Sequence, residues 1–346
     1  MTVRIAFVGA GRMAVNHVMA LARVPDAELV AMCDVVPEQI QRVPAAVRQS
    51  TWASAGVSDL PQPAAYTDLE RMLAQERPDA VYVCLPPAVR GEAEMKVIGA
   101  GLPVLVEKPL ALDLSIARAV LNEIRQREVI AASGYQYRYA SWAQKAVDAL
   151  AGHVVGQATA SRFSRLPSLS WYRQQAQSGG QLIETVTHQV DLLRLLAGEV
   201  RTVSAFGAIR ADRARGPEDD IFDVQSVALL FESGAVGTLA CNLLSPTHRW
   251  QVDIACEGLD VQLLGDRVRV VDDNGEREWP MDDHEPLLAE STAFVRAVAE
   301  GRPDLVRSTY ESGVRTLAVT MAADRSERLG VPVDVPALLR EELGLE

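Results

Sequence analysis

A glycine-rich turn near the N-terminus constrains the fold of this chain more than any other feature. Gly9-Ala10-Gly11-Arg12-Met13-Ala14 follows an apolar, strand-like run at 3–9 and opens a segment of helical periodicity at 13–24. The first glycine allows a tight turn, the second lets the backbone approach a ligand, and Ala14 permits close packing of helix on strand. The free N–H groups at the start of such a helix suit a phosphate.

A carboxylate at the end of the next strand-like run indicates which phosphate compound binds. Asp34 lies 20 residues after Ala14, the spacing expected for a carboxylate on the adenosine ribose of a dinucleotide. It would repel a 2′-phosphate, and residues 35–41 contain no arginine or lysine to bind one. We therefore expect NAD rather than NADP. The alternative interpretation of the glycine motif is an ordinary turn that binds no dinucleotide. The expected contacts are Gly9, Gly11, Arg12, Met13 and Asp34.

The hydrophobic pattern changes along the chain. In the first third, apolar runs at 3–9, 28–34, 80–85, 104–107 and 129–132 alternate with helical segments at 13–24, 68–76, 89–100 and 113–127. This alternation is typical of a buried parallel sheet flanked by helices. The stretch 44–63 is rich in alanine, proline, glutamine and serine, and we expect a loop with at most a short helix there.

Beyond about residue 134, apolar and polar residues alternate. Strands are predicted at 155–165, 200–209, 222–231, 236–244, 250–256, 261–264 and 268–271, with turn signals at Ser233-Gly234 and Asn274-Gly275. Helices are predicted at 181–197, 286–299 and 309–329. The predicted fold is an α/β Rossmann dinucleotide-binding domain at 1–133, followed by an α+β domain at 134–346 with a large, mostly antiparallel open sheet. C-terminal helices that pack back on the first domain are compatible with this division.

Composition excludes several classes of partner. The chain has 346 residues, 48% of them hydrophobic, and a formal net charge of −12, so we expect a globular protein that binds no nucleic acid. No apolar stretch approaches the ~18 residues that span a bilayer, and the N-terminus opens with a strand rather than an export signal. The cysteines show no metal-ligand spacing and lie in apolar runs, which indicates buried thiols in a cytoplasmic protein. They are Cys33, Cys84, Cys241 and Cys256.

Further motifs follow in a characteristic order. Glu107-Lys108-Pro109 closes a predicted strand at the edge where such sheets bind ligands. The others are Pro86-Pro87, Gly134-Tyr135-Gln136-Tyr137-Arg138-Tyr139, and Gly179-Gly180 before the helix that carries His188 and Asp191. Together with the glycine turn, this set resembles the glucose–fructose oxidoreductase, inositol dehydrogenase and rhizopine-catabolism family (Gfo/Idh/MocA) over nearly the whole chain.

The resemblance implies an NAD-dependent oxidoreductase that moves a hydride to or from a hydroxyl carbon of a sugar, sugar acid or cyclitol. Lys108 matches the lysine that handles the hydroxyl proton, and His188 matches a histidine that contacts the hydroxyl. Glu184 falls where the family usually has an aspartate. Further cofactor contacts implied are Leu85, Pro86, Arg90, Glu107 and Lys108, and further substrate contacts are Tyr135, Arg138, Trp171 and Arg173. Relatives form dimers or tetramers through the large sheet, so we expect a homodimer or homotetramer.

The chemistry suits these residue types. A free lysine has a pKa of about 10.4, and lowering that pKa to about 7–8 takes roughly 4 kcal/mol. Burial and the positive nicotinamide ring both disfavour the ammonium form, so both lower the pKa. A lysine on the protein surface with no catalytic role is the alternative interpretation of Lys108.

On one predicted helix Glu184 and His188 are i, i+4 neighbours, so a plain helix-surface pair is the alternative interpretation of these two residues. They also suggest a metal site with Asp191, but no second ligand cluster is visible and we expect no metal.

Three positions depart from the family pattern and bear on the substrate. Glu184 is one methylene longer than the usual aspartate, Val186 stands where glycine is common, and Arg90 stands where many members have histidine. For Arg90 we favour a solvated helix residue over a contact to cofactor or anionic substrate. Arg162, Arg165 and Arg173 together would favour an acidic or phosphorylated sugar. An NAD-dependent glycoside hydrolase that acts by transient oxidation and a non-catalytic NAD-binding sensor are the alternative functions.

Overall fold

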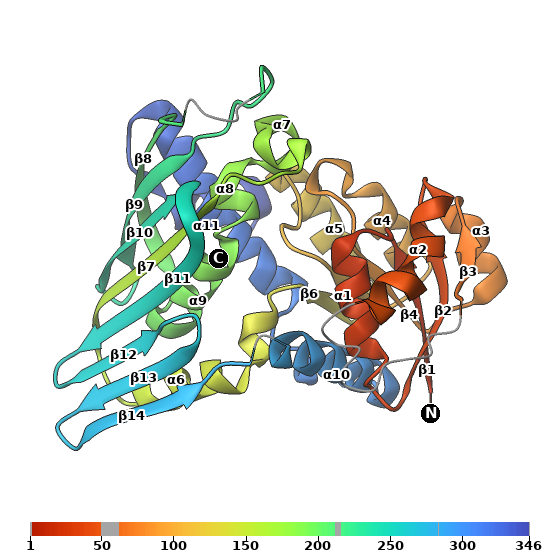
Figure 1. The fold of residues 1–346 in the computed structure, drawn as a ribbon, viewed down its shortest axis with the longest axis horizontal. Helices are drawn as coiled ribbons and strands as arrows, with labels where there is room; N and C mark the ends of the chain where they lie inside the picture. Colours follow the sequence, from red (N-terminus) through yellow and green to blue (C-terminus); the bar gives the residue numbers. More distant parts are fainter. Residues whose placement is uncertain (1, 50–61, 212–215, 283, 346) are drawn as a thin grey trace. The chain divides into compact units, whose positions relative to one another are not determined.

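The chain forms two compact units (Figure 1). The computed structural model describes residues 2–49, 62–211, 216–282 and 284–345, so part of the predicted loop at 44–63 lies outside the described residues. The first unit comprises Met1–Leu110, Ile116–Tyr139 and His284–Ser312, and the second comprises Ala111–Ser115, Ala140–Asp283 and Gly313–Glu346. The predicted division was a single cut between residues 133 and 134. The observed grouping differs in placing 134–139 and His284–Ser312 in the first unit and Ala111–Ser115 in the second.

The first unit is built on a six-stranded parallel sheet in the order β3-β2-β1-β4-β5-β6. Its strands are β1 (Val3–Val8), β2 (Ala27–Cys33), β3 (Ala64–Tyr66), β4 (Ala80–Val83), β5 (Val104–Val106) and β6 (Ala131–Ser133). The prediction of a Rossmann-type sheet is confirmed, although the three-residue β3 was not predicted. The strand order reverses between β1 and β4, and the crevice at the carboxyl ends of these strands is where such sheets bind ligands.

Helices pack on this sheet. They are α1 (Arg12–Leu21), α2 (Pro37–Arg48), α3 (Leu69–Glu76), α4 (Glu92–Gly99), α5 (Leu114–Arg127) and α10 (Glu285–Glu300), with 3₁₀ turns η2 (Pro87–Val89), η3 (Gln136–Tyr139) and η5 (Pro303–Leu305). The structure corrects the predicted loop at its start, because α2 continues through Pro44 to Arg48. Ile40, Val43 and Val47 recur at helical spacing and are all buried, so the buried face outweighs the missing N–H of the internal proline.

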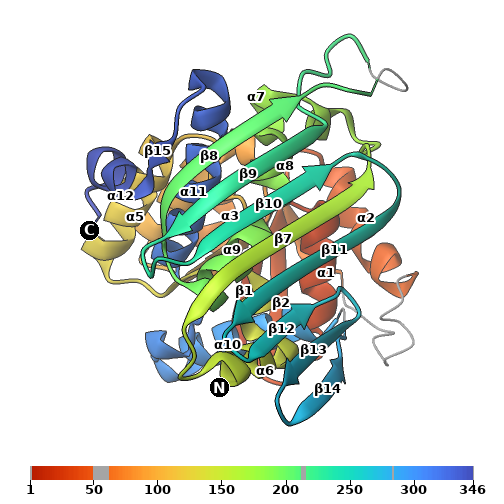
Figure 2. The same ribbon diagram turned by 90° about the vertical axis from the view of Figure 1, so that its left-hand side faces the viewer.

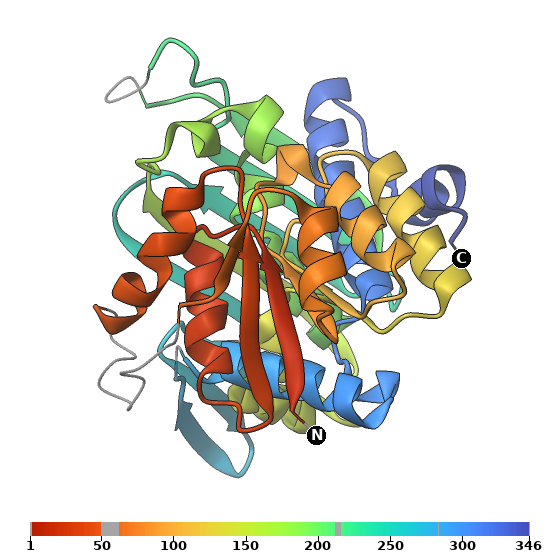
Figure 3. The same cartoon turned by 90° about the vertical axis from the view of Figure 1, so that its right-hand side faces the viewer.

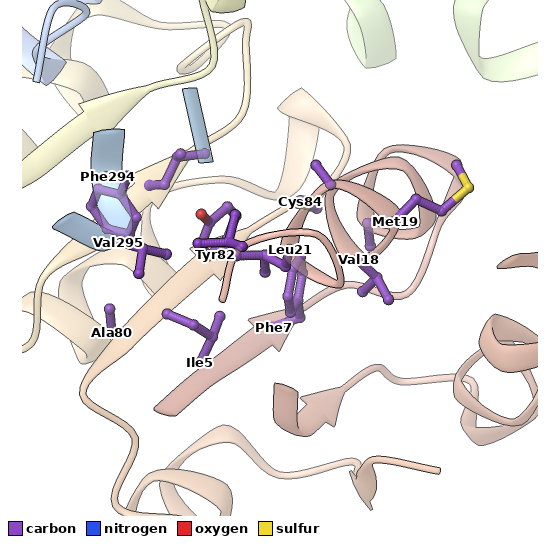
Figure 4. Close-up of a cluster of buried hydrophobic side chains, with 14 of the residues drawn as sticks. Ile5, Phe7, Val18, Met19, Leu21, Ala80, Tyr82, Cys84, Phe294 and Val295 are labelled. Atoms are coloured by element: carbon purple, nitrogen blue, oxygen red, sulfur yellow. The ribbon is translucent and has the colours of Figure 1, made fainter. Parts of the chain in front are cut away.

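The core of the first unit includes helix α10 as well as α1. Phe7 stacks on Tyr82 with ring centroids 4.9 Å apart, and Phe294 of α10 meets the other side of Tyr82 edge-on at 5.4 Å. Figure 4 shows these rings together with Ile5, Val18, Leu21, Ala80 and Val295. Helix α10 therefore completes the hydrophobic core beside β1 and β4 (Figure 3).

The second unit is built on a nine-stranded sheet in the order β14-β13-β12-β11-β7-β10-β9-β8-β15 (Figure 2). Its strands are β7 (Val155–Arg165), β8 (Val200–Ala208), β9 (Val224–Phe231), β10 (Val236–Asn242), β11 (Leu244–Cys256), β12 (Leu259–Leu263), β13 (Arg267–Asp272), β14 (Gly275–Pro280) and β15 (Val333–Asp334). Neighbouring strands are antiparallel except β7 and β10, which pair in parallel. The predicted large, mostly antiparallel sheet is confirmed, with β14 and β15 as additions.

The helices of the second unit are α6 (Ser141–Leu150), α7 (Gln175–Ser178), α8 (Gly180–Glu184), α9 (Thr187–Ala197), α11 (Tyr310–Leu329) and α12 (Val335–Leu338), with a 3₁₀ turn η4 (Ser170–Arg173) and a π turn η6 (Leu339–Leu343). The predicted continuous helix 181–197 is wrong, because it breaks between Glu184 and Thr187. The N–H groups of Thr185 and Val186 both donate to Gln181 O, at 3.0 and 2.9 Å. The β-branched run 185–187 favours such an interruption.

A buried polar cluster fixes α9 to α11. The Thr316 hydroxyl donates to Asp191 Oδ1 at 2.8 Å, and Arg194 Nη1 donates to the same hydroxyl oxygen at 2.5 Å. Arg194 also binds both carboxylate oxygens of Glu199, at 2.9 and 2.6 Å. Asp191 therefore serves the packing of the helix that carries His188.

Replacing Thr316 by valine should lower the free energy of unfolding of the second unit by about 1–3 kcal/mol, because it removes a hydroxyl from two buried charged groups. Thr320→Val is the matched control on α11: Thr320 is equally buried but donates only to Leu317 O within its own helix. Urea unfolding followed by tryptophan fluorescence measures both, since four of the five tryptophans of the chain lie in this unit. They are Trp142, Trp171, Trp250 and Trp279. Equal losses in the two variants would contradict this role.

Candidate active site

The two glycines of the N-terminal turn are required for different reasons. Gly9 has φ +91°, and a Cβ there would lie 2.5 Å from the carbonyl oxygen of Cys84, so the fold itself excludes a side chain. Gly11 has φ −75°, and a Cβ there would meet no heavy atom within 4 Å. Because the protein does not require glycine at residue 11, close approach of a ligand to the backbone explains it better.

The start of α1 is suited to an anion. Gly11 is its N-cap, no described side chain caps the helix, and the first turn contains no acidic residue. The backbone N–H groups of this turn, which begins with Arg12 and Met13, carry the positive end of the helix dipole. The arrangement fits the diphosphate of NAD.

Asp34 is held directly beside the glycine turn. Its Oδ2 accepts a hydrogen bond from Ala10 N at 2.8 Å, and its Oδ1 accepts one from Val36 N at 2.9 Å. Each carboxylate oxygen has a second acceptor position, which a ribose hydroxyl can use. The next residue, Val35, is 87% exposed and offers no charge to a 2′-phosphate. The residues present therefore fit NAD.

Glu107 and Lys108 follow β5 at the carboxyl edge of the sheet. The buried Glu107 accepts a hydrogen bond from Lys108 N at Oε2, 2.9 Å away, and its Oε1 lies 2.8 Å from His17 Nε2. Gly134 packs so closely that a Cβ there would lie 2.9 Å from Glu107 Cδ. Burial alone would raise the pKa of Glu107, but His17, Lys108 and Arg90 outweigh it and hold the pKa below its ordinary value. The half-buried Lys108 thus extends from a fixed backbone.

His17 was not predicted as a site residue. It lies on the buried face of α1 with Ala14, Val18 and Leu21, and its side chain is fully buried. One signal was present in the sequence: a histidine on the apolar face of a helix requires a polar partner. Sequence reasoning could not have identified Glu107 as that partner, because the two residues are 90 positions apart.

Arg90 is not a solvated helix residue, so that preferred interpretation is wrong. It precedes α4, and its side chain is only 1% exposed. Its Nη2 donates to Leu85 O at 2.8 Å, and its Nη1 lies 4.0 Å from Glu94 Oε1. Glu94 in turn accepts a hydrogen bond from Gly91 N at 2.7 Å. Arg90 therefore braces the Leu85-Pro86 turn that follows β4.

Glu184 and His188 lie on two successive helices rather than on one face of a single helix. Glu184 ends α8 and is buried, whereas His188 lies in the first turn of α9 and is half-buried. Val186, in the break between them, is fully buried. The predicted i, i+4 relationship on one helix is thus corrected by the interruption at 185–186.

The remaining predicted site residues differ in their surroundings. Tyr135 is fully buried, and the half-buried Arg138 follows it in η3. In η4, Trp171 packs on Tyr172 with ring centroids 4.0 Å apart. Arg173 forms an ion pair of 3.1 Å with Asp219. Among the other arginines considered, Arg165 donates to Pro246 O at 2.5 Å.

The described residues include no candidate metal site and no helix that could span a membrane. Within residues 2–49, 62–211, 216–282 and 284–345, no three His, Cys, Asp or Glu side chains are grouped to hold a metal ion. Over the same ranges, no helix combines the length and apolar character needed to cross a bilayer. The four cysteines are free thiols, and Cys256 is half-buried rather than buried.

Comparison with known proteins gives consistent matches over both units. Residues 3–135 match the oxidoreductase family with an NAD-binding Rossmann fold, GFO/IDH/MocA, and residues 144–270 match the GFO/IDH/MocA C-terminal domain. The chain is 27% identical to myo-inositol 2-dehydrogenase of Thermotoga maritima, covering 93% of this chain and 96% of that one. It is 26% identical to scyllo-inositol 2-dehydrogenase (NAD(+)) of Bacillus subtilis, covering 96% of each. The WlbA dehydrogenase of Bordetella pertussis, solved with NADH and UDP-GlcNAcA, superposes with a TM-score of 0.78 at 25% identity, covering 96% of this chain and 99% of that one.

The two glycines of the turn give a matched test of the cofactor site. Gly11→Ala should leave the free energy of unfolding within about 0.5 kcal/mol of the parent and weaken NADH binding at least ~10-fold, because the methyl group obstructs only the ligand. Gly9→Ala should cost about 2 kcal/mol or more through the clash with Cys84 O and the positive φ. Urea unfolding and NADH fluorescence titration measure the two effects. Unchanged NADH affinity in Gly11→Ala would contradict the proposed placement of the diphosphate.

Proposed function

Because this chain belongs to the GFO/IDH/MocA oxidoreductase family, whose first domain is an NAD-binding Rossmann fold, we propose that it transfers a hydride between NAD and a hydroxyl-bearing carbon of a sugar, sugar acid or cyclitol. The observation that carries the proposal is the position of Lys108. It is half-buried at the carboxyl end of β5, on a backbone fixed by Glu107. Full-length similarity to two inositol dehydrogenases supports a polyol as substrate.

Lys108 is the proton-transferring group in this proposal. Oxidation of an alcohol requires loss of the hydroxyl proton as hydride leaves the carbon, and NAD⁺ supplies the hydride acceptor when it is bound. The chain has only three lysines, Lys96, Lys108 and Lys145, among 34 basic residues. An arginine cannot be deprotonated in a protein, whereas the lysine at residue 108 can act as base and, in the reducing direction, as acid.

We assign the substrate contact on the second unit to His188, with Glu184 as its neighbour in the chain. A half-buried imidazole at the start of α9 can donate to or accept from a substrate hydroxyl. Glu184 ends the preceding helix, where the carboxylate is buried. The family resemblance gives these residues the same roles.

A neutral polyol is a better candidate than a phosphorylated sugar. Arg173, one of three arginines considered for an anionic substrate, already forms an ion pair with Asp219. Arg165 donates a hydrogen bond from its Nε to the backbone carbonyl of Pro246. Trp171 lies in η4 with Arg173 and offers an aromatic face. Such a face suits the C–H face of a ring that bears hydroxyl groups.

Lys108→Met should abolish NADH formation while leaving NADH binding within about 3-fold of the parent, because the base contributes ~10²–10⁴ in rate. Lys108→Arg should be equally inactive, since it keeps the charge but cannot accept a proton. Lys145→Met, at an exposed lysine, is the control and should keep full activity. The assay follows NADH fluorescence with NAD⁺ and myo-inositol, scyllo-inositol, glucose and gluconate. Activity in Lys108→Met would contradict the mechanism, as would release of nitrophenol from an aryl glycoside without net NADH.

We also propose that the chain forms a homo-oligomer through the outer face of β8, β9 and β10. On these strands one face is buried, while the other carries uncharged residues, including Phe206, which is 74% exposed. The residues paired across this face are Thr202–Leu230–Val236, Ser204–Ala228–Thr238 and Phe206–Ser226–Ala240. A sheet face without charged side chains is typical of a surface that a binding partner covers. A second copy of the chain supplies an identical face.

Sedimentation velocity at micromolar concentration tests this assembly. The parent chain should sediment as a dimer or tetramer, and Ala228→Glu, which places a carboxylate in the middle of the face, should dissociate it at least ~10-fold more readily. Leu329→Glu at the exposed end of α11 is the control and should leave the oligomer unchanged. A monomeric parent chain would overturn the proposal.

A further inference from the structure

A buried hydrogen-bonded pair joins helix α1 to the segment after β5 that contains Lys108. His17 Nε2 lies 2.8 Å from Glu107 Oε1, and the two side chains are 0% and 3% exposed. His17 lies one and a half turns after the glycine turn on α1. Glu107 immediately precedes Lys108 in the sequence. The pair therefore connects the helix that receives the diphosphate to the residue proposed to move the proton.

The carboxylate of Glu107 is fixed from three directions. One oxygen is bound to His17, the other accepts from Lys108 N at 2.9 Å, and Gly134 packs against the carboxyl carbon. Since Glu107 is ionised and can only accept hydrogen bonds, His17 must donate through Nε2. The side chain of His17 thus sets the position of the carboxylate, and the carboxylate sets the backbone at Lys108.

Packing alone does not account for this pair. Helix α1 is already held on the sheet by Val18, Met19 and Leu21 in the core of the first unit. Replacing both partners of a buried hydrogen bond by apolar groups of the same shape can leave stability nearly unchanged. His17 also contacts Tyr82 edge-on at 5.2 Å, a contact that a phenyl ring would make equally well. What only the present residues supply is a fixed negative charge beside Lys108.

The groups that face Glu107 hold it in the charged form. They are His17 from α1, Arg90 and Cys84 from the segment after β4, and its neighbour Lys108. Burial favours the neutral acid, and the three basic groups outweigh burial to lower the pKa of Glu107. The ionised carboxylate is therefore a negative charge beside Lys108, and its loss would change the electrostatic surroundings of that residue.

We propose that His17 is a positioning residue for the reaction, acting through Glu107 to fix both the backbone and the electrostatic surroundings of Lys108. The inference rests on the proposed role of Lys108 in proton transfer. It adds a residue, distant in sequence, that makes the cofactor helix and the base one rigid unit. His17 touches neither the reacting atoms nor the solvent, so its effect must pass through Glu107.

The first experiment measures the reactivity of Lys108 without turnover. The chain, saturated with NAD⁺, is labelled with acetic anhydride from neutral to alkaline pH, and mass spectrometry quantifies the peptides of Lys96, Lys108 and Lys145. In Glu107→Gln and His17→Phe, the rate for Lys108 at neutral pH, relative to its alkaline plateau, should rise about 3- to 10-fold. The first variant removes the negative charge, and the second leaves the buried carboxyl to take up a proton. Lys96 and Lys145 are internal controls and should not change.

Two substitutions of His17 distinguish the effect of its hydrogen bond from the effect of its aromatic ring. His17→Phe keeps the edge-on contact with Tyr82 and loses the donor, whereas His17→Gln loses the ring and keeps an N–H donor near the position of Nε2. With NAD⁺ and myo-inositol, His17→Phe should lower kcat about 10- to 100-fold with less than a ~3-fold change in KM for NAD⁺. His17→Gln should restore kcat to within about 3-fold of the parent and leave Lys108 labelling as in the parent.

The outcomes distinguish this proposal from the proposed function. Equal labelling of Lys108 in the parent, Glu107→Gln and His17→Phe would overturn the positioning role, whatever the activity. Equal loss of kcat in His17→Phe and His17→Gln would also overturn it, because it would reduce His17 to a packing residue. Absence of NADH formation by the parent on every polyol would contradict the proposed function, and the labelling result would still decide the role of His17.

Discussion

The close approach of the glycine turn to strand β4 is the constraint on which the first unit depends. Gly9 lies so near the carbonyl of Cys84 that no side chain fits, and Cys84 N in turn donates to Val8 O at 2.8 Å. Strands β1 and β4 therefore stay paired up to the point where the chain turns into α1. This single contact places the start of α1 at the reversal of strand order, which is where a parallel sheet binds ligands.

Other features of the site depend on that geometry. With the turn fixed, Ala10 N points at Asp34, which holds the carboxylate beside the expected ribose. With the start of α1 fixed, His17 is directed into the protein, where it meets Glu107 at the end of β5. A parallel sheet brings the carboxyl ends of its strands to one edge. Residues from three segments that are far apart in the sequence therefore lie together there.

The sequence predicts those parts of the candidate site that are encoded locally. The glycine turn, Asp34 and Glu107-Lys108-Pro109 are each short patterns beside a strand, and the structure places each at the carboxyl end of its strand. The prediction fails where long-range packing decides. Burial of Arg90 depends on Leu85 O and Glu94, and the partner of His17 is 90 residues away.

The break in the helix that leads to His188 shows a different limit. The apolar spacing of 181–197 fits one helix, but two N–H groups compete for Gln181 O and a new helix begins at Thr187. Helical periodicity cannot show such an interruption, because the buried positions remain similar on both sides. The β-branched residues at 185–187 were the only local signal.

The proposed reaction requires direct transfer of hydrogen between a polyol carbon and the nicotinamide ring. Myo-inositol with deuterium on its ring carbons, incubated with NAD⁺ and the parent chain, tests this claim most directly when the reduced cofactor is examined by mass spectrometry. The NADH formed should carry one deuterium from the substrate. Reduced cofactor without deuterium would contradict direct transfer.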